Sequence, residues 1–146
     1  MPKLFTLAQA QSLIPRVDRL LREAIALKSG FIEAERALQS LSERVMLMGG
    51  MIVDRDQFLQ VKSRRESEAE CLRNAMEKLQ DLGCLVKDLD IGLVDFPTLF
   101  RGQEVYLCWK VGEPSIQFWH GVDQGFGGRK AIDRDFCDHL EGDRAT

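Results

Sequence analysis

Residues 83–129 read GCLVKDLDIGLVDFPTLFRGQEVYLCWKVGEPSIQFWHGVDQGFGGR, and they differ sharply from the residues before them. This stretch contains both tryptophans, the only tyrosine and one of the two histidines of the chain. Short β-branched and aromatic runs alternate with Gly, Pro and Asp, as in strands joined by tight turns. Residues 7–82 instead show a long helical period. The sequence therefore predicts an α+β fold, in which a long antiparallel helical hairpin precedes a small, mainly antiparallel β-sheet head.

The first helix is predicted to follow Thr6, which forms a capping box with Gln9. Pro15 lacks an N–H group, so we expect a short helix over residues 7–14 that kinks into a longer one starting at Pro15. From there, apolar residues recur every seven residues, as in a coiled-coil seam, until Gly49-Gly50 end the helix. The two rows are Val17, Ala24, Phe31, Leu38 and Val45, and Leu20, Leu27, Ala34, Leu41 and Met48.

A return helix is predicted from its N-cap, Asp54, to Leu82, with Gly83 as the stop signal. Its middle, KSRRESE at residues 62–68, contains no apolar residue. This segment either faces solvent or forms a polar layer that sets the register between helices or subunits. The apolar residues of the return helix are Phe58, Val61, Leu72, Ala75, Leu79 and Leu82.

The length of the arm predicts self-association. At 1.5 Å per residue the first helix would be roughly 45–50 Å long, and one small head cannot cover such a seam. A second copy of the chain can cover it. We therefore expect a homodimer formed through the helical arm, for example as an antiparallel four-helix arrangement.

The head is predicted to contain strands at residues 104–110 and 115–120, joined by a hairpin loop at residues 111–114. If Lys110 pairs with Ser115, Val105 lies opposite His120, and His120 ends the apolar core face. Two shorter strands are expected upstream, at residues 85–89 and at residues 93–96, where Pro97 closes the second strand. The sheet would then have three or four strands.

His120 at the open end of this hairpin is the centre of a candidate site. An imidazole with two or three carboxylates can bind a divalent transition metal or perform acid–base chemistry. The spacing matches no known ligand signature, and a structural histidine is the commoner occupant of such a position. Asp95 could equally hold a turn by accepting backbone N–H groups. The candidate metal ligands are His120, Asp123, Glu104, Asp95 and Asp88.

Tyr106, Trp119 and His120 could instead line a pocket for a small molecule or a peptide. The segment GVDQGFGGR at residues 121–129 is rich in glycine, and its backbone N–H groups could bind an anion with Arg129 as the counter-charge. The commoner alternative for such a segment is a tight loop packed over the head. The candidate ligand-binding residues are thus Tyr106, Trp119 and Arg129.

Composition narrows the class of protein. A net charge of -3 and a pI near 5.4 give no indication of nucleic-acid binding. Cys71, Cys84, Cys108 and Cys137 show no CxxC spacing, and Cys84 and Cys108 have apolar neighbours, as small buried hydrophobes do. There is no leader-like apolar segment and no run near the roughly 20 residues that span a bilayer. We expect a soluble cytoplasmic protein that does not bind membranes.

The organisation expected from these patterns is a single domain over residues 1–146. It comprises a helical arm at residues 7–82, a β head at residues 83–132 and a polar tail at residues 133–146. The tail is expected to fray after a short helical turn.

Four phrases resemble the uncharacterised family called domain of unknown function 2203: LFTLAQAQSLIPRV, LGCLVKDLDIGLVDFP, EVYLCWKVGEPSIQFWH and GFGGRKAI. The resemblance covers about residues 4–132 and implies a bacterial or archaeal protein, which agrees with a cytoplasmic location. It implies no activity, substrate or catalytic residue. The matching positions are Lys87, Asp88, Gly92, Asp95, Pro97, Tyr106, Trp109, Gly112, Glu113, Trp119, His120, Gly125, Phe126 and Arg129.

Three functions are compatible with the sequence. The one we favour is an oligomeric binding or assembly module that uses the arm as its interaction surface. The second is a metal-dependent protein, such as a hydrolase, with a divalent transition metal near His120. The third is a small-ligand sensor with an aromatic pocket. No catalytic motif of recognised spacing is present, so the sequence leaves enzymatic activity open.

Overall fold

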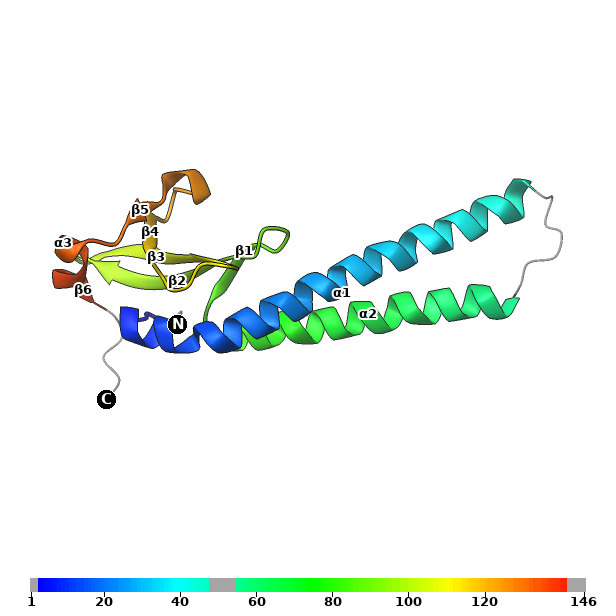
Figure 1. The fold of residues 1–146 in the computed structure, drawn as a ribbon, viewed down its shortest axis with the longest axis horizontal. Helices are drawn as coiled ribbons and strands as arrows, with labels where there is room; N and C mark the ends of the chain where they lie inside the picture. The colour runs from blue at the N-terminus through cyan, green and yellow to red at the C-terminus, as the bar shows by residue number, and fades with distance from the viewer. Residues whose placement is uncertain (1–2, 48–54, 142–146) are drawn as a thin grey trace. The chain divides into compact units, whose positions relative to one another are not determined.

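The computed structural model describes residues 3–47 and 55–141. Two long helices are followed by an antiparallel sheet, which confirms the predicted α+β class (Figure 1). The chain forms two compact units, which we call the head unit (Met1–Arg22 and Glu77–Thr146) and the hairpin unit (Glu23–Met76). No helix within the described ranges combines the length and the apolar character needed to cross a membrane.

Helix α1 (Leu7–Leu47) begins with the predicted capping box. The Gln9 N–H donates to Thr6 Oγ1 at 3.1 Å, and the Thr6 N–H donates to Gln9 Oε1 at 2.9 Å. The helix continues through Pro15, so the expected separate helix over residues 7–14 is wrong. A proline in this position removes one intrahelical hydrogen bond. Burial of Ile14 and Val17 on either side of it stabilises the continuous helix.

In the hairpin unit, α1 packs against α2 (Arg55–Asp81). Residues 62–68 are mostly exposed, yet two arginines of this segment bridge the helices. Arg64 reaches Glu33 at 3.2 Å, and Arg65 reaches Glu35 at 2.9 Å. The segment is therefore solvated, with two ion pairs that join the helices at its surface, and a role in setting the register stays a prediction. Helix α2 ends as predicted, before Gly83, whose φ is +95°. Met48, Gly49-Gly50 and Asp54 lie outside the described residues.

The described part of the head unit contains one sheet with the strand order β1-β2-β3-β4-β5, in which all neighbours are antiparallel. The strands are β1 (Leu85–Asp88), β2 (Leu93–Phe100), β3 (Gln103–Lys110), β4 (Phe118–Gly121) and β5 (Lys130–Ala131). A short strand β6 (Leu140–Glu141) pairs with β2, and the elements between β4 and β6 include the 3-10 helix η1 (Phe126–Gly128) and α3 (Arg134–Asp138).

Strand β2 continues past Pro97, where the sequence predicted its end. The carbonyl of Pro97 accepts the Phe5 N–H at 2.7 Å. In a strand the N–H and C=O of one residue point to the same side, so the missing N–H of Pro97 faces Phe5 and not β3. The ladder between β2 and β3 therefore loses no hydrogen bond, which is why proline is tolerated here.

The pairing of β3 with β4 differs by one residue from the predicted register. Tyr106, and not Val105, lies opposite His120. The connection spans residues 111–117, because Ile116 turns into the core and its N–H donates to Gln11 Oε1 at 2.9 Å. A shift of one residue moves every side chain of a strand to the opposite face. His120 consequently shares a face with Tyr106 and Cys108 instead of Val105 and Leu107.

The short helical turn expected in the tail is present as α3, but the chain does not fray directly after it, since residues 140–141 form β6. Asp133 caps α3 by accepting the Phe136 N–H at 2.8 Å. Phe136 is buried and stacks on Trp119 with ring centroids 4.8 Å apart. The chain then returns to the edge of β2 as β6. A single large apolar residue thus anchors a segment that is otherwise polar.

Candidate functional site

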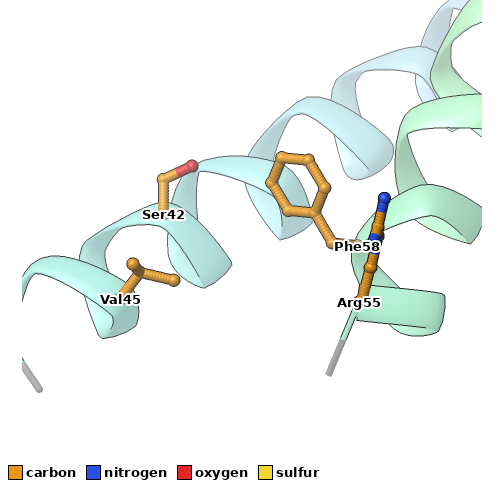
Figure 2. Close-up of a pocket in the computed structure, with 4 residues that line it drawn as sticks. All are labelled: Ser42, Val45, Arg55 and Phe58. Atoms are coloured by element: carbon orange, nitrogen blue, oxygen red, sulfur yellow. The ribbon is translucent and has the colours of Figure 1, made fainter. Parts of the chain in front are cut away.

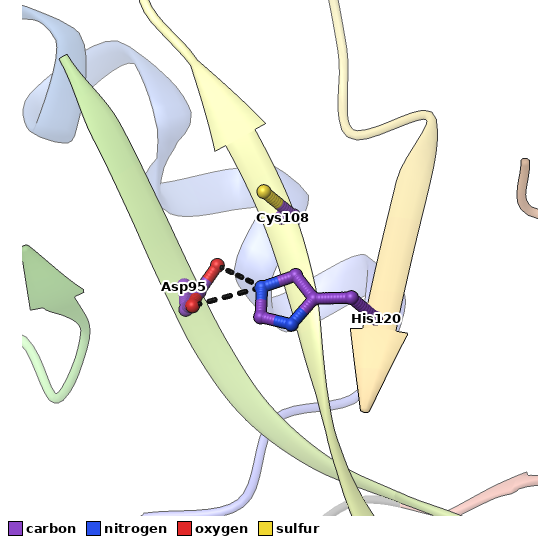
Figure 3. A group of neighbouring side chains, drawn as sticks. All are labelled: Asp95, Cys108 and His120. Carbon is purple, nitrogen blue, oxygen red and sulfur yellow. Dashed lines mark hydrogen bonds and ion pairs between the residues drawn. The ribbon is translucent and has the colours of Figure 1, made fainter. Parts of the chain in front are cut away.

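Three adjacent strands bring Asp95, Cys108 and His120 together on one face of the sheet (Figure 3). Asp95 comes from β2 and pairs directly with Cys108 of β3, while His120 comes from β4. One ligand atom from each side chain lies within 4.8 Å of the others. The exposed fractions of these residues are 0%, 0% and 2%. Such complete burial of an acid and an imidazole requires a specific compensating interaction.

Hydrogen bonds fix the orientation of the imidazole ring. His120 Nδ1 lies 2.8 Å from the carbonyl oxygen of Gly121. A carbonyl can only accept, so Nδ1 carries a proton and donates it. His120 Nε2 lies 2.9 and 3.0 Å from the two carboxyl oxygens of Asp95, and a second proton must sit between these groups. The pair is then neutral in sum, either as imidazolium and carboxylate or as neutral imidazole and carboxylic acid.

Cys108 is not arranged as a nucleophile. Burial, reinforced by the nearby charge of Asp95, raises the pKa of its thiol to about 12. In a Cys–His–Asp triad the thiol needs a basic ring nitrogen to remove its proton. Both nitrogens of His120 are already engaged, with Gly121 and with Asp95. The geometry is therefore unsuited to a Cys–His–Asp catalytic triad, although all three residue types are present.

The other candidate metal ligands lie apart from this cluster. Asp88 ends β1 and holds a turn by accepting the N–H groups of Asp90 and Ile91. Glu104 is exposed near the start of β3, and Asp123 is exposed in the turn after β4. Of the five residues predicted as metal ligands, the structure thus brings together His120 and Asp95.

The candidate ligand-binding residues are separated as well. Tyr106 packs edge-on against His120, with ring centroids 5.6 Å apart, and lines a pocket of about 540 Å³ together with Lys3 and Glu104. Trp119 pairs with Leu107 and so faces the other side of the sheet, where Phe136 covers it. Desolvation of Tyr106, reinforced by the charges of Glu104 and Asp95, raises the pKa of its hydroxyl.

Arg129 forms an ion pair with Glu113 at 2.5 Å, and its guanidinium stacks on the ring of Phe118 at 4.1 Å. It lies over Phe126 as well, at 5.0 Å from the ring centroid. These contacts match the packed-loop interpretation of residues 121–129, with Glu113 in the position that an anionic ligand would take.

A family model described as an uncharacterised conserved protein, DUF2203, matches residues 3–132. The chain belongs to the DUF2203 family. No curated protein and no solved structure matches it. Asp95, Cys108 and His120 all lie within the stretch that matches the DUF2203 model.

Sequence reasoning missed Cys108 as a member of this cluster, although the turn between β2 and β3 could have paired it with Asp95. Arg101 and Gly102 both have positive φ, at 52° and 77°, and they join β2 directly to β3. Two such residues form the turn that matches the twist of a tight hairpin. Taking Arg101-Gly102 as that turn pairs Phe100 with Gln103, and counting back along both strands pairs Asp95 with Cys108.

A second candidate site lies at the tip of the hairpin unit (Figure 2). Ser42 and Val45 of α1 face Arg55 and Phe58 of α2 across a pocket of about 520 Å³. Val45 and Phe58 belong to the two predicted seams and are only half-buried. The two helices therefore do not bury their apolar residues completely against each other in this DUF2203 chain.

Proposed function

We propose that this DUF2203 protein is an oligomeric assembly module, in which the hairpin units of two copies pack against each other. The observation that carries this proposal is the incomplete burial of the seam in the outer half of the hairpin. Phe31, Leu38 and Val45 of α1 remain half-buried. The neighbouring Ile32 and Leu59 are 38% and 51% exposed. Apolar side chains spaced along both helices favour association, because covering them removes apolar surface from water.

The occupant we propose is a second copy of this chain. The half-buried residues recur with the seven-residue period of a coiled coil, so they form a stripe that matches another helix and not a compact ligand. Two identical hairpins bring two such stripes together around a two-fold axis and form a four-helix bundle. Ala24 and Ala34 of the same rows are already fully buried within one chain, so the half-buried larger residues are the part of the seam that a partner would cover.

Leu38→Asp tests this association. A charge in the middle of the stripe should convert a dimer to a monomer, because an unpaired carboxylate would be buried in the interface. The matched control is Ser40→Asp, which adds the same charge at an exposed position of the same helix. Mass is measured by size-exclusion chromatography with light scattering over a range of concentrations, and far-ultraviolet circular dichroism checks the fold. A monomeric wild type, or a dimer that tolerates Leu38→Asp, would refute the proposal.

We also propose a cytoplasmic location, on the basis of the sequence pattern. In the structure all four cysteines are free thiols, and Cys84 and Cys108 are buried, which supports this location. Buried thiols behave as small apolar residues and suit a reducing compartment. Detection of the native protein in cell fractions tests this location directly, and its recovery outside the cytoplasmic fraction would contradict it.

A further inference from the structure

The geometry points to a binding site for one Zn²⁺ ion, with Cys108 Sγ, His120 Nε2 and a carboxylate oxygen of Asp95 as ligands (Figure 3). This site is independent of the proposed association, because all three residues belong to the head unit. It differs from the metal set that the sequence suggested, since a buried thiol takes the place of the three exposed carboxylates.

The donor set selects the kind of ion. One thiolate, one imidazole and one carboxylate are the ligands that Zn²⁺ binds in proteins, whereas Mg²⁺ and Ca²⁺ prefer oxygen alone. Around a tetrahedral Zn²⁺ such atoms lie roughly 3–4 Å apart. The three ligand atoms here lie within 4.8 Å of one another and come from three hydrogen-bonded strands, so little movement is needed. The second oxygen of Asp95 or a water molecule would supply the fourth ligand.

His120 already makes the hydrogen bond through its other ring nitrogen that is usual for a metal-bound histidine. Metal-bound histidines usually donate their other ring N–H to a carbonyl or carboxylate, which fixes the tautomer and the direction of the ring. His120 Nδ1 donates to the Gly121 carbonyl at 2.8 Å, and this contact directs Nε2 toward Asp95 and Cys108.

Charge balance agrees with this ion. Zn²⁺ bound to one thiolate, one carboxylate and a neutral imidazole has no net charge, which suits a site with almost no exposure to water. One cationic group close to the site is Arg129, whose Nη2 lies 3.4 Å from the Cys108 carbonyl oxygen. Its ion pair with Glu113 offsets part of its positive charge beside the bound cation.

The test uses the full chain, treated with a chelator and then incubated with Zn²⁺ or Co²⁺ and desalted. We expect one metal ion per chain by inductively coupled plasma mass spectrometry. With Co²⁺ we expect the visible bands of tetrahedral coordination and a thiolate-to-cobalt charge-transfer band. Cys108→Ala should abolish the charge-transfer band and weaken Zn²⁺ binding by about 100-fold or more, because loss of a ligand costs more than the 10–100-fold cost of losing an outer partner.

The chain offers matched controls. Cys84→Ala removes the other buried thiol of the head unit, and His139→Ala removes the other histidine, so both should bind metal as the wild type does. Tryptophan fluorescence verifies the folding of each variant, and His120→Gln provides a second test of the ligand set. Wild-type protein that retains no stoichiometric metal would overturn the inference and leave Asp95 and His120 as a structural pair. So would metal binding that is undiminished in Cys108→Ala and His120→Gln.

Discussion

Arg129 illustrates how a single residue can hold the loop between β4 and β5 onto the sheet. Its side chain is 11% exposed and that of Glu113 is 18% exposed. Glu113 Oε1 accepts both the Arg129 guanidinium and the Lys110 N–H, the latter at 2.7 Å. The Nε atom of Arg129 is buried without a hydrogen-bond partner in the described structure. Glu113 therefore supplies most of the interaction that offsets the loss of water around the buried guanidinium.

Glu113→Ala should lower the free energy of unfolding by about 1–3 kcal/mol. The substitution leaves a partly buried cation and a backbone N–H without their acceptor, and partial contact with water keeps the loss below that of a fully buried pair. The control is Asp18→Ala, which breaks an exposed pair with Arg22 in the same head unit and should change stability by about 0.5 kcal/mol or less. Urea unfolding followed by tryptophan fluorescence measures both, and equal losses would contradict this role of Glu113.

At the scale of elements, α3 shows how a short helix can complete a sheet. Phe136 is 1% exposed, and its ring lies 4.8 Å from the rings of both Phe100 and Trp119. This aromatic contact joins α3 to β2 and β4, and β6 then pairs with the edge of β2. The helix itself is too short to be stable alone. Its position therefore depends on one buried ring.

Phe136→Ala should destabilise the head by about 3–5 kcal/mol, the usual cost of removing a buried aromatic ring from a core. Phe126→Ala serves as the control, because Phe126 is 46% exposed and contributes mainly its contact with Arg129. Its loss should cost about 1 kcal/mol or less. Chemical denaturation of the two variants distinguishes them. A small effect of Phe136→Ala would mean that residues 133–141 contribute little to the stability of the head.

The sequence predicted the long elements because their signals are local and repeated. The capping box at Thr6, the apolar period of both helices and the stop at Gly83 each depend on residues close in the chain. The extent of β2 and the anchoring of α3 depend on distant partners. Pro97 is tolerated because Phe5 lies beside it, and Phe136 is held by Phe100 and Trp119. Neither contact leaves a pattern in the neighbouring residues.

The candidate site was predicted in part for a related reason. Residue type predicts His120 and Asp95, whereas the apolar neighbours of Cys108 predict only that it is buried, which the structure confirms. Its place beside His120 is missed because a hairpin loop at residues 111–114 puts His120 on the wrong face of the sheet. The true connection depends on Gln11, which accepts the Ile116 N–H from the other end of the chain. The turn at Arg101-Gly102 was the local feature that could have paired Asp95 with Cys108.

At the scale of the whole molecule, two spectroscopic signals can follow the unfolding of the two compact units separately. Trp109 and Trp119 both lie in the head unit, and Trp109 donates its indole N–H to the Glu113 carbonyl at 3.0 Å. Tryptophan fluorescence therefore follows the head alone. Far-ultraviolet circular dichroism is dominated by α1 and α2, which supply every described residue of the hairpin unit. The two signals can thus separate events in the two units.

If two hairpin units associate, thermal unfolding followed by circular dichroism should move to higher temperature as the protein is concentrated. Each tenfold rise in concentration adds about 1.4 kcal/mol to the apparent stability of a folded dimer, because mass action favours the associated state. The fluorescence transition should move less, since the seam residues that we propose for the interface lie in the hairpin unit. A circular dichroism midpoint that is constant over a hundredfold range would argue against association through the arm. Equal shifts of both midpoints would instead mean that the interface also includes the head unit. In that case Leu38→Asp should remove the concentration dependence of both transitions.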